Sequence, residues 1–269
     1  MATALPPLPG DYEPTRATLH AYARAVGALP RAHGTAHPLW WHASLKVRPE
    51  GLVTDPIPLP DGGALAAGMD LRRHHAVLTA STGEQRFFRL DEGMTATDLG
   101  DALAEAAAGY GLTGPLDRSR FEDDAPRAYS PDAATAYFEA FTAAAGILER
   151  HRVTLGRAVG PVQVWPHGFD LAFEWFGTKM ERHGNGTLPA QINLGFYPGG
   201  EPYFYSSPWP FDPAVTGIGL PIGARWHTEG WQGAMLPYTG VQGDPDAAAR
   251  ITEFARVVHQ AASPGLEAP

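Results

Sequence analysis

Apolar residues recur at helical spacing in four segments of this chain. Between residues 14 and 29, Leu19, Tyr22 and Val26 fall on one side of a helix. Residues 95–110 show the same period. Two further segments begin with a helix-start signal, in which a polar residue is followed by proline and an acidic residue. These segments begin at Ser130-Pro131-Asp132 and Asp244-Pro245-Asp246, so the pattern predicts four helices.

Between the predicted helices, apolar and polar residues alternate with the two-residue period of a β-strand. Over residues 169–176, this alternation puts Asp170 and Glu174 opposite an apolar set. Over residues 39–48, the polar side consists of Trp40, His42, Ser44, Lys46 and Arg48. Turns rich in glycine and proline separate further predicted strands at 64–71, 75–81, 85–90, 161–166, 190–197, 202–207 and 231–236.

The order of helix, strands and helix occurs twice along the chain. No strand–helix–strand alternation is present, so a parallel doubly wound sheet is disfavoured. We expect a pseudo-duplicated α+β fold, in which antiparallel strands of both halves share a sheet or half-barrel covered by helices. The expected halves are residues 1–112 and 131–262, either as two parts or as one composite domain. Residues 113–130 would connect them, and residues 263–269 would form a flexible tail.

Composition excludes several classes of site. The 269 residues include no cysteine, which rules out disulfides, thiolate nucleophiles and iron–sulfur clusters. The net charge is −9 and no segment concentrates lysine and arginine, so nucleic-acid binding is disfavoured. No apolar stretch approaches the ~20 residues of a membrane span. The amino terminus lacks the basic and apolar regions of a signal peptide. We therefore expect a cytoplasmic protein without membrane contact, and the sequence leaves its oligomeric state undetermined.

Several short motifs in the strand segments resemble an uncharacterised bacterial family, domain of unknown function 5996. The motifs cover about residues 8 to 262: Pro38–Val47 with Gly51–Thr54, Pro161–Trp165 with Phe169–Ala172, Leu194–Gly199, Pro202–Tyr205 and Leu236–Tyr238. The resemblance implies no activity, because the family has none assigned. In the family pattern a histidine stands at the position of Gln163, and an acidic residue stands near Gln191. A metal or proton-transfer site at those positions in relatives would therefore be altered here.

Two ionisable residues are the candidates for catalysis. His42 lies on the polar side of the first predicted strand, and its ordinary pKa near 6.5 suits a general base. Asp170 is the candidate partner on the second half. Glu174 lies about 13 Å from Asp170 along a strand, too far for a directly coupled carboxyl pair. Two alternatives stay open at this point. His42 can be a hydrogen-bonded structural histidine, and Asp170 can lie on a solvated sheet face.

A second set of residues suits ligand binding. Aromatic rings with polar groups can stack on a flat ligand, and an arginine or histidine can hold an anionic group. The candidate binding residues are Trp40, Trp165, Gln163, Gln191, Tyr205, Arg225 and His227. The histidine spacings predict no metal site, and no cofactor is predicted.

Two functions remain: an enzyme that acts on a small polar metabolite by acid–base chemistry in a cleft between the halves, or a non-catalytic small-molecule binding protein with an aromatic-lined cavity. A protein-interaction role ranks third.

Overall fold

The computed structural model describes residues 4–156, 158–184 and 186–268. The chain forms two compact units. The amino-terminal unit consists of Leu8–Glu139 and Gln163–Phe169. The carboxy-terminal unit holds the described residues within Met1–Pro7, Ala140–Val162 and Asp170–Pro269. The strands of both units are counted in one twelve-stranded sheet, and the strands and helices of each unit are described separately below.

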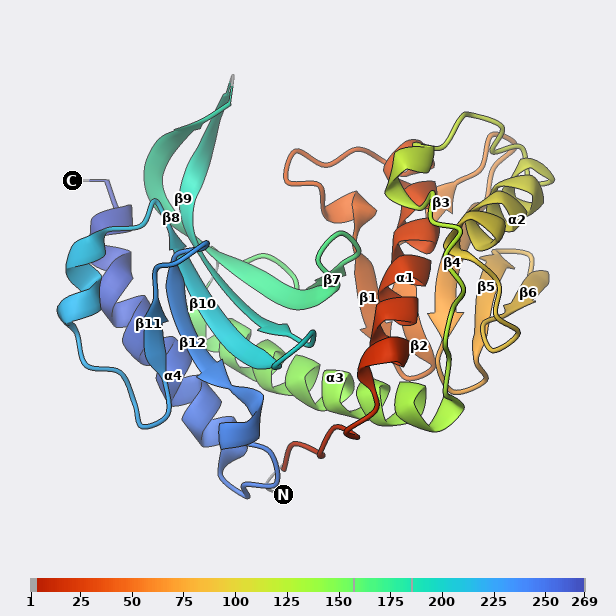
Figure 1. The fold of residues 1–269 in the computed structure, drawn as a ribbon. Coiled ribbons are helices and arrows are strands. Elements are labelled where there is room, and N and C mark those ends of the chain that lie inside the picture. Colours follow the sequence, from red (N-terminus) through yellow and green to blue (C-terminus); the bar gives the residue numbers. More distant parts are fainter. Residues whose placement is uncertain (1–3, 157, 185, 269) are drawn as a thin grey trace. The chain divides into compact units, whose positions relative to one another are not determined.

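The amino-terminal unit is an antiparallel sheet packed against two helices (Figure 1). The helices are α1 (Glu13–His33) and α2 (Ala96–Ala108). The strand order is β7-β1-β2-β4-β5-β6, and β3 pairs with β4. The strands are β1 (Leu45–Arg48), β2 (Gly51–Thr54), β3 (Ile57–Pro58), β4 (Ala64–Asp70), β5 (His75–Ala80), β6 (Gln85–Arg89) and β7 (Gln163–Trp165).

Strand register sorts the residues of this sheet onto two faces. Directly opposed residues in neighbouring strands share a face, and successive residues alternate between faces. Leu45, Leu65 and Leu78 lie on the face that α1 and α2 cover, and all three are fully buried. Val77 pairs with Phe87 on the opposite face, where the Phe87 side chain is 51% exposed. One face of the sheet is therefore the core, and the opposite face carries an exposed aromatic side chain.

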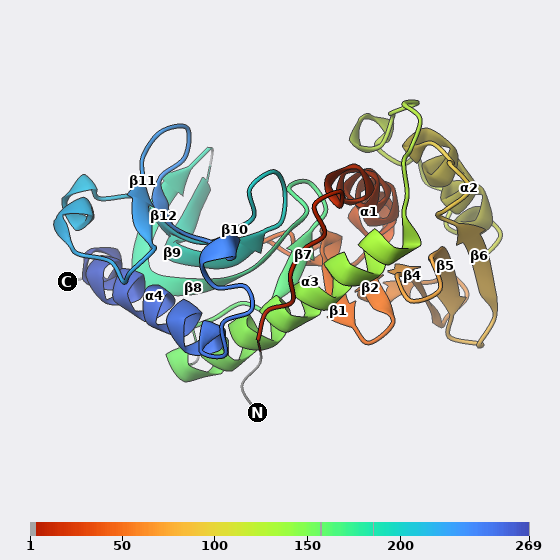
Figure 2. The ribbon, with the colours of Figure 1, turned by 60° about the horizontal axis from the view of Figure 1, so that its bottom comes forward.

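The carboxy-terminal unit repeats this arrangement with a different topology (Figure 2). Its antiparallel strand order is β11-β12-β10-β9-β8. Helix α4 (Ala247–Ala262) packs on one face, and Phe141 of helix α3 (Pro131–Arg152) contacts Phe196 on that face with ring centroids 6.1 Å apart. The strands are β8 (Asp170–His183), β9 (Gly186–Tyr197), β10 (Tyr203–Trp209), β11 (Arg225–His227) and β12 (Gly233–Pro237).

The expected α+β class with antiparallel strands is confirmed, and so are the four α-helices among the described residues. The internal duplication is not confirmed, because the two units differ in strand number and connectivity. The expected halves at 1–112 and 131–262 stay a prediction from the sequence. After α4, residues Ser263–Leu266 form a short 3-10 turn in which Leu266 is buried. No described helix is both long enough and apolar enough to cross a bilayer.

One predicted strand is wrong over part of its length. The strand expected at residues 39–48 begins only at Leu45. Trp40 adopts a left-handed backbone conformation with φ of 61°, and Trp41–Ala43 form a 3-10 turn. A strand requires an extended backbone at every residue, so the apparent alternation before Leu45 belongs to a turn. His42 and Trp40 consequently do not lie on a strand face.

Candidate functional site

The carboxy-terminal sheet carries a polar face on the side opposite its helices. One row of paired residues crosses all five strands: Ala172, Gly195, Tyr205, Met235 and Arg225. Residues two positions along each strand point the same way. We therefore define the polar face by Asp170, Glu174, Gln191, Asn193, Tyr203, Tyr205, Arg225 and His227. Five of the predicted site residues, namely Asp170, Gln191, Tyr205, Arg225 and His227, thus share one face.

Tyr205 and Asp170 are in direct contact on this face. The Tyr205 hydroxyl donates a short hydrogen bond to Asp170 Oδ2. Gly195 lies between them on β9, and a Cβ at that position would come within 2.6 Å of two Tyr205 ring atoms. The ring can cross β9 only because residue 195 has no side chain. Burial raises the pKa of Tyr205 well above its ordinary value, and the charge on Asp170 raises it further. The phenol therefore stays protonated at neutral pH.

Aromatic rings surround this pair. The Tyr203 and Trp231 rings are parallel within 6° with centroids 5.9 Å apart, and Tyr205 meets Trp231 edge-on at 6.2 Å. The His227 ring centroid lies 4.5 Å from that of Trp231. A third ring between two parallel rings needs about 7 Å, since each carbon contact takes about 3.5 Å. A flat ligand would therefore stack on the outside of this cluster rather than enter between Tyr203 and Trp231.

The same face contains two further polar groups of low exposure. The Glu174 carboxylate is on a residue only 8% exposed, and its charge also contributes to the raised pKa of Tyr205. Asn193 pairs directly with Glu174 across β8 and β9. Its Oδ1 atom is buried and receives no hydrogen bond from any residue that the structure describes. An acceptor in this position is available to a ligand hydroxyl or amine.

The predicted catalytic residue His42 belongs to the amino-terminal unit, whereas Asp170 belongs to the other. His42 Nδ1 accepts the His37 backbone N–H at 3.1 Å, so its proton is on Nε2. Its ring stacks on Trp40 at a centroid distance of 5.5 Å, and the Arg31 guanidinium lies 4.4 Å from the Trp40 ring. Partial burial, with the nearby Arg31 charge, lowers the pKa of His42. His42 is therefore a neutral imidazole in a ring stack at neutral pH.

Gln163 and Trp165 lie on β7 of the amino-terminal unit. Gln163 is fully buried, and its Oε1 atom accepts hydrogen bonds from Ser44 Oγ at 2.6 Å and Lys46 Nζ at 2.8 Å. Trp165 is partly exposed. No role for Ser44 or Lys46 follows from the sequence, although the alternation in residues 39–48 does place them on the same side. Their meeting with Gln163 depends on the pairing of β1 with β7, two segments more than 110 residues apart.

Nearly the whole chain matches a family model. A family model described as "Family of unknown function (DUF5996)" matches residues 5–267. The chain belongs to DUF5996. No curated protein and no solved structure matches it at a significant level. The resemblance seen in the strand motifs is thereby confirmed, and the function of this DUF5996 protein has to be argued from its own residues.

The two neutral amides that distinguish this DUF5996 chain from the expected family pattern lie in different units. Gln163 is in the buried Ser44–Lys46 cluster, and Gln191 is on the polar face, where it pairs with Phe176 and Trp209. Among the described residues, no group of three or more histidine, aspartate or glutamate side chains is placed to hold a metal ion.

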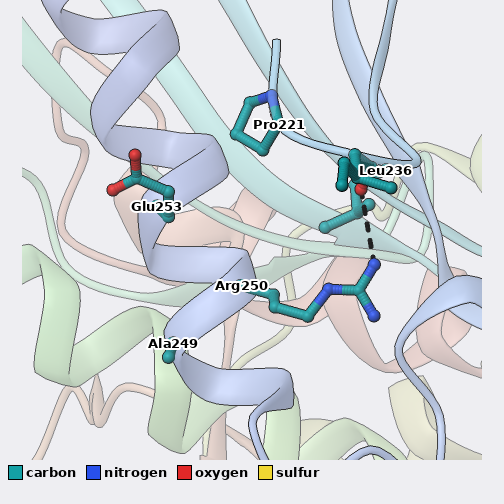
Figure 3. Close-up of a pocket in the computed structure, with 6 residues that line it drawn as sticks. Pro221, Leu236, Ala249, Arg250 and Glu253 are labelled. Carbon is teal, nitrogen blue, oxygen red and sulfur yellow. Dashed lines mark hydrogen bonds between the residues drawn. The ribbon is translucent and has the colours of Figure 1, made fainter.

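A pocket of about 360 Å³ lies apart from the polar face, between α4 and the segment before β11 (Figure 3). Its lining residues are Pro221, Ile222, Leu236, Ala249, Arg250 and Glu253. Arg250 is already engaged, because it donates to the Gly240 carbonyl at 2.7 Å and to Asp244 at 2.8 Å. The pocket therefore presents mainly aliphatic groups, and the polar face is the better candidate site.

Proposed function

We propose that this DUF5996 protein binds a small polar ligand on the polar face of its carboxy-terminal sheet. The observation that carries the proposal is the Tyr205–Asp170 hydrogen bond, set among aromatic rings on the side of the sheet opposite Phe196 and α4. Aromatic rings with a few converging polar groups are the usual composition of a small-molecule site.

The polar groups select the class of ligand. Asn193 Oδ1 is a buried acceptor that no described residue engages, and Asp170 and Glu174 place carboxyl oxygens on the same face. A ligand with a hydroxyl or amine group would donate to Asn193 Oδ1. Its less polar side would stack on Trp231 and Tyr203. We therefore expect a polyol, a sugar-like molecule or a small amine.

The test is ligand retention and binding by matched variants. Native mass spectrometry of gently purified protein detects a retained molecule. Titration with sugars, polyols, amino acids and small amines, followed by tryptophan fluorescence, detects weaker binding. We expect Tyr205→Phe and Asp170→Asn to weaken binding at least tenfold. Tyr197→Phe removes a phenol from the same face, where the Tyr197 ring lies 5.4 Å from that of Tyr203, and serves as the control. Equal binding by all four proteins contradicts the proposal.

A second candidate function is an acid–base enzyme acting on the same ligand. The contact of a protonated phenol with a carboxylate supports it, because Tyr205 can donate a proton and Asp170 can accept one. Incubation of the same compounds in D₂O with the protein, followed by proton NMR, detects a new product or deuterium on carbon. Turnover that disappears in Asp170→Asn supports the enzyme, whereas binding without any conversion supports the binding protein.

A further inference from the structure

We infer that a second copy of this chain docks at the pocket beside α4, and that each copy inserts its Ile222 side chain into the pocket of the other. The pocket has a volume of about 360 Å³. Residues 217–224, which we call the Ile222 loop, belong to the same carboxy-terminal unit. The residues that define the polar face are not among those that line the pocket, so this contact does not depend on the ligand proposed for that face.

The Ile222 loop exposes large apolar side chains. Ile222 is 92% exposed and Ile218 is 48% exposed. Single apolar residues on a surface are common, but apolar residues gathered at one exposed place mark a contact surface. Burial of these side chains against another apolar surface is therefore favourable.

The backbone of the Ile222 loop fixes the position of this side chain. The Ala224 N–H donates to the Pro221 carbonyl at 3.0 Å, and Gly223 has a φ of 88°. This is the pattern of a type II turn, in which the third residue takes a positive φ and the second lies at the tip. Arg250 Nη2 also donates to the Ile222 carbonyl at 3.3 Å. An Ile222 side chain presented on such a turn loses little backbone freedom when it binds.

The pocket beside the loop has room for an isoleucine side chain. Leu236 is 1% exposed and forms its floor, and α4 presents only the small Ala249 side chain there (Figure 3). A cavity of about 150 Å³ holds benzene, which has six carbons, whereas the isoleucine side chain has four. Ile222 lines the edge of its own pocket but leaves it unfilled, because its side chain is in solvent.

The protruding side chain and the receiving pocket lie side by side on one surface. A single two-fold axis can therefore place the Ile222 of each copy in the pocket of the other, and the contact closes after two copies. A side chain and a pocket on distant surfaces would instead build an open filament. The arrangement here favours a symmetric dimer.

The distribution of charge also fits a second copy. The chain has a net charge of −9, so two copies repel each other over most of their surface, but residues 213–224 contain no charged residue. The two charged groups of the pocket are balanced within their own copy. Arg250 pairs with Asp244 at 2.8 Å, and Glu253 accepts from Arg256 Nε at 2.7 Å. A two-fold contact at this place therefore brings no unbalanced like charges together.

Sedimentation velocity of the full chain tests the dimer. A contact limited to one loop and one pocket is small, so we expect a Kd between about 10 µM and about 1 mM. Ile222→Asp removes the inserted side chain, and Ala249→Arg fills the pocket. Both positions are exposed, and each variant should weaken association about tenfold or more, because it places a charge in the apolar contact.

Val153→Asp is the control, since Val153 is 62% exposed in the same unit and does not line the pocket. It should associate as the wild type does. A wild type that stays monomeric up to about 1 mM overturns the inference and leaves the pocket to an occupant of another kind. Association that Ile222→Asp and Ala249→Arg retain at the strength of Val153→Asp also overturns it.

Introduced cysteines locate the contact, because the chain has none of its own. A mixture of Ile222→Cys and Ala249→Cys proteins should form a disulfide-linked dimer under mild oxidation, since a disulfide requires the two residues to lie next to each other. A mixture of Ile222→Cys and Val153→Cys should not. Equal linking in the two mixtures, or none in the first, contradicts the exchange of Ile222 between copies.

Discussion

A single glycine determines whether the phenol and the carboxylate of the polar face can meet. Tyr205 and Asp170 lie on β10 and β8, and the strand between them presents Gly195. Any side chain at this position would occupy the path of the Tyr205 ring. The sequence shows Gly195 only as part of Leu194–Gly199, and a glycine inside a strand commonly marks such a close approach.

Gly195→Ala should destabilise the folded protein by about 1–3 kcal/mol, because the new Cβ would overpack the site. The alanine Cβ would lie 2.6 Å from Tyr205 Cζ and also 2.6 Å from the Leu171 carbonyl oxygen, so both neighbours would have to move. Urea unfolding measures the loss. Gly217→Ala is the control, since a Cβ at Gly217 meets nothing within 4 Å. Equal stability of the two variants would show that the ring does not need the space above Gly195.

The ionisation of Tyr205 offers a second prediction at the scale of one residue. The raised pKa of Tyr205 means that the folded state favours the neutral phenol. The contribution of the neutral Tyr205 phenol to the free energy of unfolding is full below the ordinary tyrosine pKa of about 10. This contribution is lost as the pH rises above that value. Between pH 9 and pH 11, the free energy of unfolding should therefore decrease less in Tyr205→Phe than in the wild type, as measured by urea unfolding. Identical pH dependence in the two proteins would contradict a buried, protonated Tyr205.

At the scale of elements, local sequence signals predicted the helices better than the strands. Helix α3 begins at the predicted Ser130-Pro131-Asp132 signal. Helix α2, predicted from its apolar period alone, begins at a capping box, in which Thr95 Oγ1 accepts the Asp98 N–H at 3.0 Å and the Asp98 side chain accepts the Thr95 N–H. Such signals lie within a few residues of the helix they begin. Over residues 39–44, by contrast, alternating polarity came from a turn around Trp40, and only the backbone conformation distinguishes it from a strand.

Removal of the α2 cap tests how much this local signal contributes. Thr95→Ala should lower the free energy of unfolding by about 1 kcal/mol, because the Asp98 N–H loses its acceptor. Thr113→Ala removes the same atoms at an exposed position in the same unit and should be close to neutral. Thermal and urea unfolding of both variants make the comparison. A Thr95→Ala protein as stable as Thr113→Ala would mean that tertiary packing alone holds the helix start.

At the scale of the whole molecule, sequence reasoning missed contacts between residues that lie far apart in the sequence. The strand alternation at 169–176 placed Asp170 correctly on a polar side, and the structure adds Gln191, Tyr205, Arg225 and His227 to the same face through register. The contacts of Gln163 with Ser44 and Lys46 were not predictable in this way. They join β7 to β1 and to the residue before it, and neither segment contains a signal for the other.

Both units contain histidines that are at least partly buried, so the molecule as a whole should be sensitive to acid. Burial lowers the pKa of His20 in the amino-terminal unit, and of His151 and His259 in the carboxy-terminal unit. A nearby His259 lowers the pKa of His151 further. A lowered pKa means that the unfolded chain binds more protons, so stability is full above pH of about 6.5 and falls as the pH drops below it.

We expect the free energy of unfolding to decrease between pH 7 and pH 5, and His151→Phe to reduce this decrease. His183→Gln, a substitution at an exposed histidine, is the control. Urea unfolding at several pH values measures all three proteins. A wild type with constant stability over this range would mean that these histidines are not held neutral in the folded state.

The exposed end of the amino-terminal sheet has a consequence for solubility. Strand β6 ends that sheet and carries the half-exposed Phe87. An unprotected edge strand is a template on which another chain can add a strand and begin to aggregate. Arg86 and Arg89 flank Phe87, and each is in an ion pair, with Glu84 at 2.7 Å and Asp91 at 2.7 Å. These two charged residues act as gatekeepers, and their replacement by valine would turn β6 into an aggregation-prone segment.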